Sequence, residues 1–168
     1  PEAIKSLEYF VDLMQFAPPG VSNFSHEEAT SSFMQGLTGI WFDATALAPW
    51  IEDPSRSMVA GKAGYIAPPG DYAAVAGWNL AISSQSKNKD AAWAFIVYML
   101  SREMADDYIA NGGVVTRTSI LNDPIYQQKF SYYREISETL DKAYNLIAEG
   151  VDWRPRLPEW PQMGEIMG

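Results

Sequence analysis

The sequence predicts an α/β fold in which short strands are flanked by longer helices. Short apolar runs with the alternation of strands, of which 77–82 is the clearest, occur between segments with helical spacing of apolar residues, of which 89–101 is the strongest. Alternation of the two kinds of segment along a chain is typical of the α/β class. The sequence has no internal repeat of fixed period, which argues against a helical repeat scaffold.

The first half of the chain combines helices that have clear end signals with short apolar strands. Residues 2–16 place apolar side chains on one helical face, and the Pro-Pro-Gly sequence at 18–20 ends that helix. Ser25 and Glu28 have the spacing of a capping box, so a second helix is expected to begin there. The other elements predicted in this half are a strand at 38–42, a short helix at 44–51 and a strand at 64–67.

The second half of the chain is predicted to be mainly helical. The apolar residues of 89–101 follow the helical spacing, and Asn88 precedes them in the position of an N-cap. A further helix is expected to start at Ser101 and to end at 111–113, where two glycines follow an asparagine. The other elements predicted here are the strand at 77–82, an extended stretch at 114–118, a short helical piece from 122 and a long helix at 131–148.

Composition and charge exclude several classes of function. The 168 residues are 47% hydrophobic and 20% charged, and no apolar run is long enough to cross a membrane. A net charge of −9 repels phosphate backbones, so nucleic acid is not expected as a partner. The chain has no cysteine and one histidine, His26, so we expect no metal site and no cofactor. His26 is expected to be an exposed residue at the start of a helix.

Six motifs follow one another along the chain. They are FMQG at 33–36 with the strand that follows it, GWNLAI at 77–82, SKNKDAAWAFI at 86–96, GG at 112–113 with RTS at 117–119, NDP at 122–124 and RPRLPE at 154–159. In its order and spacing this series resembles the family 1 extracellular solute-binding proteins, which include the maltose-binding protein and many sugar-alcohol binders. The resemblance covers nearly the whole chain.

The resemblance implies the C-terminal part of a two-lobed, periplasmic-binding-protein-like fold, with the ligand between the lobes. Residues 1–76 would form a segment of the C-terminal lobe, 77–118 the hinge crossing and a return into the N-terminal lobe, and 119–168 a second segment of the C-terminal lobe. The chain opens in a helical pattern without an export signal, so we expect it to be a piece of a longer protein.

The resemblance also implies a function. Members capture a sugar or a sugar alcohol and deliver it to the membrane permease of an ABC importer, without chemistry on the ligand. They are periplasmic or extracellular, and often membrane-associated. A chain that lacks part of its sheet exposes apolar surface and open strand edges, so this chain is expected to self-associate.

Two tryptophans and an arginine are candidate ligand contacts. Trp78 lies on the predicted strand 77–82, where an indole can stack on the C–H face of a sugar, and the resemblance points to the same residue; the alternative is a core position. Trp41 alternates with Ile40, so one of the two faces the core. Arg117 offers fixed donors for hydroxyl oxygens, and the family often has an arginine here; the alternative is a surface ion pair.

Two polar residues complete the candidate set. Asp43 follows the predicted strand 38–42, and a carboxylate accepts two hydroxyl hydrogen bonds at once. The alternative role of Asp43 is the N-cap of the helix at 44–51. Asn79 points opposite to Trp78 on an ideal strand, so both residues contact one ligand only if the strand bends or twists.

A carbohydrate-active hydrolase is the alternative function. Glycoside hydrolysis needs two positioned carboxylates, and the 21 acidic residues supply many candidate pairs. However, the sequence contains no nucleophile elbow, no Walker loop and no HExxH motif. No single acidic residue is marked as a catalytic acid, so the sequence favours binding without catalysis.

Overall fold

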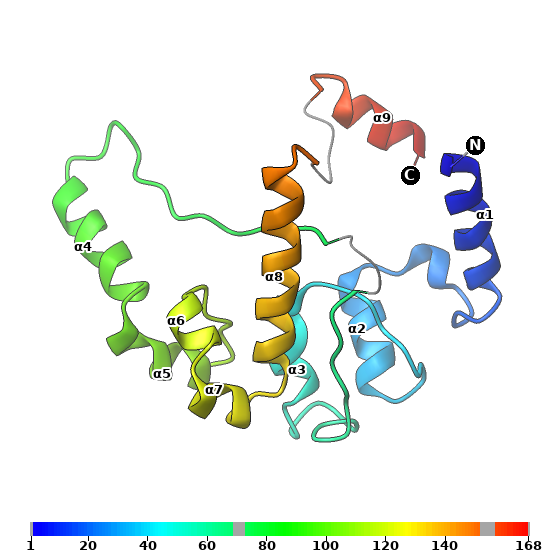
Figure 1. The fold of residues 1–168 in the computed structure, drawn as a ribbon, viewed down its shortest axis with the longest axis horizontal. Helices are drawn as coiled ribbons and strands as arrows, with labels where there is room; N and C mark the ends of the chain where they lie inside the picture. Colours follow the sequence, from blue (N-terminus) through cyan, green and yellow to red (C-terminus); the bar gives the residue numbers. More distant parts are fainter. Residues whose placement is uncertain (1, 69–72, 152–156, 168) are drawn as a thin grey trace. The chain divides into compact units, whose positions relative to one another are not determined.

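The computed structural model describes residues 2–68, 73–151 and 157–167, and the regular elements within these ranges are helical (Figure 1). The α-helices are α1 Glu2–Met14, α2 His26–Met34, α3 Ala48–Ile51, α4 Lys89–Met99, α5 Arg102–Ala110, α6 Thr118–Leu121, α7 Pro124–Lys129, α8 Tyr132–Ala148 and α9 Trp160–Met167. Two short 3-10 helices are η1 Val21–Asn23 and η2 Thr45–Leu47. The helices predicted in both halves of the chain are confirmed, with ends that agree to within a turn.

The chain forms two compact units, of which the first comprises residues 1–64 and 107–114. In this unit α2 packs against α3, and η2 leads directly into α3. The buried residues of the unit are Thr30, Ser32, Ala48, Ile51, Ser57 and Ile109. After α5 the chain turns through Gly112, whose φ of 81° lies in the left-handed region that glycine favours, in agreement with the predicted helix end at 111–113.

The second unit comprises residues 65–106 and 115–168, and α6, α7 and α8 pack together in its core. Aromatic rings fill this core. The ring centroid of the fully buried Tyr133 lies 5.1 Å from that of Phe130 and 5.2 Å from that of Tyr132. Ile120, Leu121 and Ile136 are also buried in this unit. The core is therefore built from residues close together in sequence, between α6 and the first half of α8.

An extended segment at the start of the second unit is held against α8. The ring of Tyr65 lies 5.4 Å from that of Tyr132. One carboxylate oxygen of Glu135 accepts a hydrogen bond of 3.2 Å from the backbone N–H of Ala67, and Lys142 donates one of 3.2 Å to the carbonyl oxygen of residue 68. Three turns of one helix thus fix the path of this segment.

The predicted strands are not found in the described residues. The segments 38–42, 64–67 and 77–82 form neither helix nor paired strand. An extended segment becomes a strand only when a neighbouring segment satisfies its backbone hydrogen bonds, and within the described ranges none of these segments has such a neighbour. The assignment of these segments as strands was therefore wrong for the described residues.

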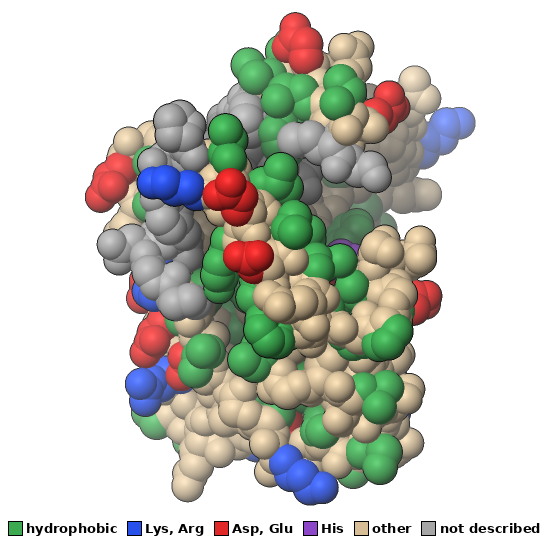
Figure 2. Space-filling model, turned by 90° about the vertical axis from the view of Figure 1, so that its right-hand side faces the viewer, with side chains coloured by type: hydrophobic (Ala, Val, Ile, Leu, Met, Phe, Trp, Pro, Cys, Tyr) green, Lys and Arg blue, Asp and Glu red, His purple; other side chains and the backbone are tan. Residues whose placement is uncertain are grey.

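Several helices expose apolar side chains. Figure 2 shows one face of the molecule, on which hydrophobic side chains lie at the surface among scattered charged ones. The exposed apolar residues of α1 are Ile4, Leu7, Tyr9, Phe10, Val11 and Leu13, and those of α4 are Trp93, Phe95, Val97 and Tyr98. None of the residues of α4 is buried. Faces of this kind are uncommon on folded monomers.

Side chains cap the starts of α2 and α7. Ser25 and Glu28 form the predicted capping box at the start of α2, in which each side chain bonds to the backbone of the first turn. Asp123 caps α7 by accepting a hydrogen bond of 3.0 Å from the backbone two residues ahead. Asn88 occupies the predicted N-cap position of α4 without a side-chain cap bond.

The capping box gives a stability prediction. Ser25→Ala removes the acceptor for a backbone N–H that the helix itself cannot satisfy, so the free energy of unfolding is expected to fall by about 1 kcal/mol. Urea unfolding followed by circular dichroism measures this loss. Ser22→Ala, on an exposed serine of η1, is the matched control and should leave the free energy of unfolding unchanged. Equal unfolding curves for Ser25→Ala and the unsubstituted protein would contradict the assignment.

Candidate functional site

The segment that contains Trp41 and Asp43 lies along α2 in the first unit. The ring of Trp41 stacks on that of Phe33 near the end of α2, with 5.9 Å between centroids and 23° between planes. Two residues later, Asp43 meets His26 in the first turn of the same helix. The extended segment therefore runs from the C-terminal end of α2 towards its N-terminal end.

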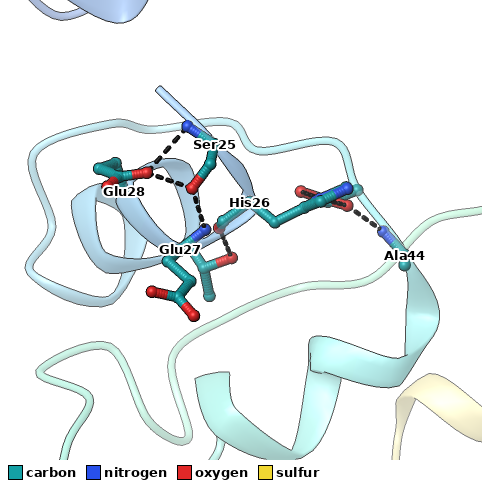
Figure 3. A network of polar contacts seen from close by, with 7 residues as sticks. Ser25, His26, Glu27, Glu28 and Ala44 are labelled. Atoms are coloured by element: carbon teal, nitrogen blue, oxygen red, sulfur yellow. Dashed lines mark hydrogen bonds and ion pairs between the residues drawn. The ribbon is translucent and has the colours of Figure 1, made fainter. Parts of the chain in front are cut away.

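Asp43 and His26 form a close polar pair; Figure 3 labels His26 and Ala44, the residue after Asp43. The Nδ1 atom of His26 lies 2.7 Å from Oδ1 and 2.8 Å from Oδ2 of Asp43, and Oδ1 also accepts a hydrogen bond of 2.7 Å from the backbone N–H of Ala44. The side chain of Asp43 is 10% exposed, whereas that of His26 is 78% exposed. Asp43 is thus covered and the imidazole faces outward.

The hydrogen bond to Asp43, followed by the attraction of its charge, raises the pKa of His26 above the ordinary value. The fold therefore favours the protonated form of His26. The contribution of His26 to stability is fully present at a pH below its ordinary pKa. It is lost as the pH rises through the higher pKa that His26 has in the folded protein. The sequence prediction that His26 is exposed at a helix start is confirmed.

The contact between His26 and Asp43 was not predicted. The two residues are 17 positions apart and belong to no shared motif, so only the packing of the extended segment against α2 brings them together. The alternative prediction made Asp43 the N-cap of the helix at 44–51. In the structure, the carboxylate accepts a hydrogen bond from the backbone N–H of Ala44, but Ala44 is itself the N-cap residue of η2, and η2 has no side-chain cap.

Trp41 combines a stacked ring with a covered N–H group. Its side chain is half-buried, and its Nε1 atom is buried without a hydrogen-bond partner within the described part of the chain. A buried donor without an acceptor costs free energy unless water or a ligand supplies one. Trp41 therefore has a packing role on Phe33 and a polar group that remains available.

Trp78 and Asn79 lie in the second unit on the extended segment 77–82. Trp78 has a relative exposure of 101%, and Asn79 is exposed as well. Neither side chain forms a hydrogen bond or a ring contact with another described residue. An indole with both faces open to solvent is free to receive an apolar surface from outside the unit.

Arg117 also lies in the second unit, at the N-cap position of α6. Its Nε–H donates a hydrogen bond to the carbonyl oxygen of Leu100, just after α4. The side chain is exposed, and among the described ion pairs it takes part in none. The guanidinium is thus held through its Nε–H by one backbone oxygen.

The five candidate residues fall into two groups. Trp41 and Asp43 belong to the first unit, and Trp78, Asn79 and Arg117 to the second.

Within the described ranges, no cluster of three or more His, Asp or Glu side chains is placed to bind a metal ion. In the same ranges, no helix has the length and hydrophobicity needed to cross a bilayer. Residues 154–156 of the motif at 154–159 lie outside the described residues.

Comparison with known families gives a match over most of the chain. Residues 1–106 match the family model described as bacterial extracellular solute-binding protein. The mannitol-binding protein of Pseudomonas aeruginosa is 33% identical over 104 residues, which are 58% of this chain and 24% of that protein. A probable amino-acid ABC transporter periplasmic-binding protein of Sinorhizobium fredii is 26% identical over 122 residues, which are 72% of this chain and 28% of that protein.

Two solved structures resemble this chain closely. An ABC transporter solute-binding protein of Agrobacterium vitis with bound D-mannitol has a TM-score of 0.69 and 34% identity, over 86% of this chain and 37% of that one. Another, of Agrobacterium radiobacter in complex with ribitol, has a TM-score of 0.74 and 28% identity, over 96% of this chain and 41% of that one. This chain therefore spans less than half the length of the relatives that it matches.

Proposed function

This chain belongs to the bacterial extracellular solute-binding protein family, and we propose from this premise that it captures a sugar alcohol or a sugar for an ABC importer. The observation that carries the proposal is the likeness, over 86% and 96% of this chain, to structures that hold D-mannitol and ribitol. The family and these relatives are binding proteins, so the chain is not an enzyme. Hydrolysis by paired carboxylates is accordingly not proposed.

The chemistry of the candidate residues suits a polyol. Hydroxyl groups both donate and accept hydrogen bonds, and a carboxylate, an amide and a guanidinium together supply acceptors and donors. The C–H surface of a polyol is apolar, and the exposed indole of Trp78 offers it a flat face. We propose Trp78, Arg117, Asn79 and Trp41 as ligand contacts, and Asp43 as a further residue of the ligand site.

We further propose the lobe assignment that the resemblance implies for the full-length protein, with 1–76 and 119–168 in the C-terminal lobe and 77–118 in the N-terminal lobe. Delivery to a permease and association with the membrane, from the periplasm or the cell exterior, complete the proposed function. The similarity to ABC transporter proteins supports these statements.

A ligand screen with the full-length protein tests the proposed function. D-Mannitol, ribitol, a monosaccharide, a disaccharide and several amino acids are each added at saturating concentration while thermal unfolding is followed. A ligand at 100 times its dissociation constant adds about 2.7 kcal/mol of stability, which shifts the melting temperature by several degrees. Stabilisation by amino acids alone would favour the function of the Sinorhizobium relative instead. Recovery of a chemically altered polyol would contradict binding without catalysis.

Self-association of the 168-residue chain is a further part of the proposal. Burial of the exposed apolar faces of α1 and α4 lowers the free energy of the system. A second copy of the chain is the partner available in a pure sample. Light scattering is expected to give a mass above 18.7 kDa. Phe95→Glu on α4 should lower that mass, whereas Asn88→Glu, which adds the same charge at an exposed polar position, should not. A uniform 18.7 kDa species at high concentration would contradict this expectation.

A further inference from the structure

The outward-facing polar group at the start of α2 is an imidazole rather than a carboxylate. We propose that His26 presents its Nε2 atom to the polyol and that Asp43 acts through His26 as a positioning residue. This inference rests on the proposed function and deepens it, because it assigns the contact in the first unit to a residue outside the five candidates.

The hydrogen bonds of Asp43 leave His26 as the group that can reach a ligand. Both carboxylate oxygens lie within 2.8 Å of Nδ1, and Oδ1 also accepts from the backbone N–H of Ala44. The carboxylate is 90% covered, whereas most of the imidazole is open. A ligand approaching this part of α2 therefore meets the ring before it meets the carboxylate.

The same contact fixes which ring nitrogen is free. A carboxylate accepts hydrogen bonds, so the proton of the neutral ring stays on Nδ1, where Asp43 holds it. Nε2 is then an acceptor in the neutral ring and a donor in the protonated ring. A hydroxyl group can satisfy either form, since it donates and accepts, whereas an apolar ligand can satisfy neither.

Few other charges act on the imidazole. In the first turn of α2, the carboxylate of Glu28 is bonded to Ser25, and Glu27 is exposed next to His26 (Figure 3). Helix α3, which packs against α2, contains no titratable residue. Asp43 is the group that raises the pKa of His26, so a change in this pKa reports on Asp43 or on a ligand at the ring.

A titration of His26 by NMR in the full-length protein tests the inference, with D-mannitol and ribitol as probes. A hydroxyl group at Nε2 forms hydrogen bonds of different strength with the protonated and the neutral ring, so saturation with polyol is expected to change the pKa of His26, because binding and protonation are linked. A change of about 0.5 or more is expected, with the matching dependence of the dissociation constant on pH. His26→Gln identifies the resonance.

Three variants distinguish the role of His26 as a ligand contact from the role of Asp43 as a positioning residue. His26→Ala is expected to weaken polyol binding about tenfold, the effect of one lost hydrogen bond to a polar group, and to abolish the pH dependence. Asp43→Asn should return the pKa of His26 towards 6.5 and move the pH profile of binding with it. Glu27→Gln, the neighbouring control, should change neither the affinity nor the pH profile by more than about twofold.

The outcomes distinguish the proposed contact of His26 with the polyol from the proposed function of polyol binding. Binding of D-mannitol or ribitol with an unchanged His26 pKa and an unaffected His26→Ala variant would overturn the inference and leave the proposed function intact. Failure of the unsubstituted protein to bind either polyol would overturn both. The titration of the unsubstituted protein decides the matter even if a variant fails to fold.

Discussion

Trp78→Ala is expected to weaken polyol binding by about 1–3 kcal/mol, or roughly tenfold to a hundredfold, the usual cost of truncating an aromatic anchor. The physical reason is that the indole is fully exposed in its own unit. Its apolar faces therefore contribute favourable burial free energy only when a ligand or another surface covers them. Isothermal titration calorimetry of the full-length protein with D-mannitol and ribitol measures the loss.

The same exposure predicts a small effect of this variant on folding. The free energy of unfolding should change by less than about 0.5 kcal/mol, as for other surface substitutions. Trp93→Ala, on an exposed tryptophan of α4 in the same unit, controls for the loss of an indole and should leave polyol affinity unchanged. Unchanged binding by Trp78→Ala together with a large drop in stability would show that Trp78 is a core residue instead.

Tyr133→Ala is expected to reduce the free energy of unfolding by about 3–5 kcal/mol, the usual range for a buried aromatic residue. Tyr133 has no exposed surface and contacts the rings of Phe130 and Tyr132, so its removal leaves a cavity at the centre of the second unit. Burial also raises the pKa of Tyr133, so its phenol stays neutral over the range in which the protein is handled.

Denaturant unfolding monitored by tyrosine and tryptophan fluorescence measures this effect. Tyr144→Ala is the matched control, because Tyr144 lies on the same helix with 57% of its surface exposed. The control is expected to cost about 0.5 kcal/mol or less. Similar losses for the two variants would mean that the aromatic cluster does not form the core of this unit.

The helices of this protein were determined by its local sequence. Ser25 and Glu28 are three residues apart, and that spacing alone places both side chains within reach of the backbone of one helical turn. Apolar residues at helical spacing share one face of α8, on which Tyr133, Ile136 and Ala143 are buried. Tyr144 and Ile147 continue the same spacing but are exposed, because periodicity shows which residues share a face but not how much of that face a neighbour covers.

The predicted strands and the candidate site show what local sequence leaves open. The alternation at 77–82 predicts an extended backbone, but a strand also needs a partner whose hydrogen bonds come from elsewhere in the chain. Trp78 was predicted as either a core residue or a ligand contact, and its exposure followed only from the packing around it. Local pattern could not decide either question.

The pair of His26 and Asp43 is the clearest case. The sequence determined that His26 begins a helix and that Asp43 follows an extended segment, and both statements hold in the structure. The tertiary structure alone decided that the two meet across 17 residues, with the carboxylate covered and the imidazole exposed. The physical reason is that helix formation and capping depend on neighbours within one turn, whereas the meeting of two side chains depends on how whole segments pack.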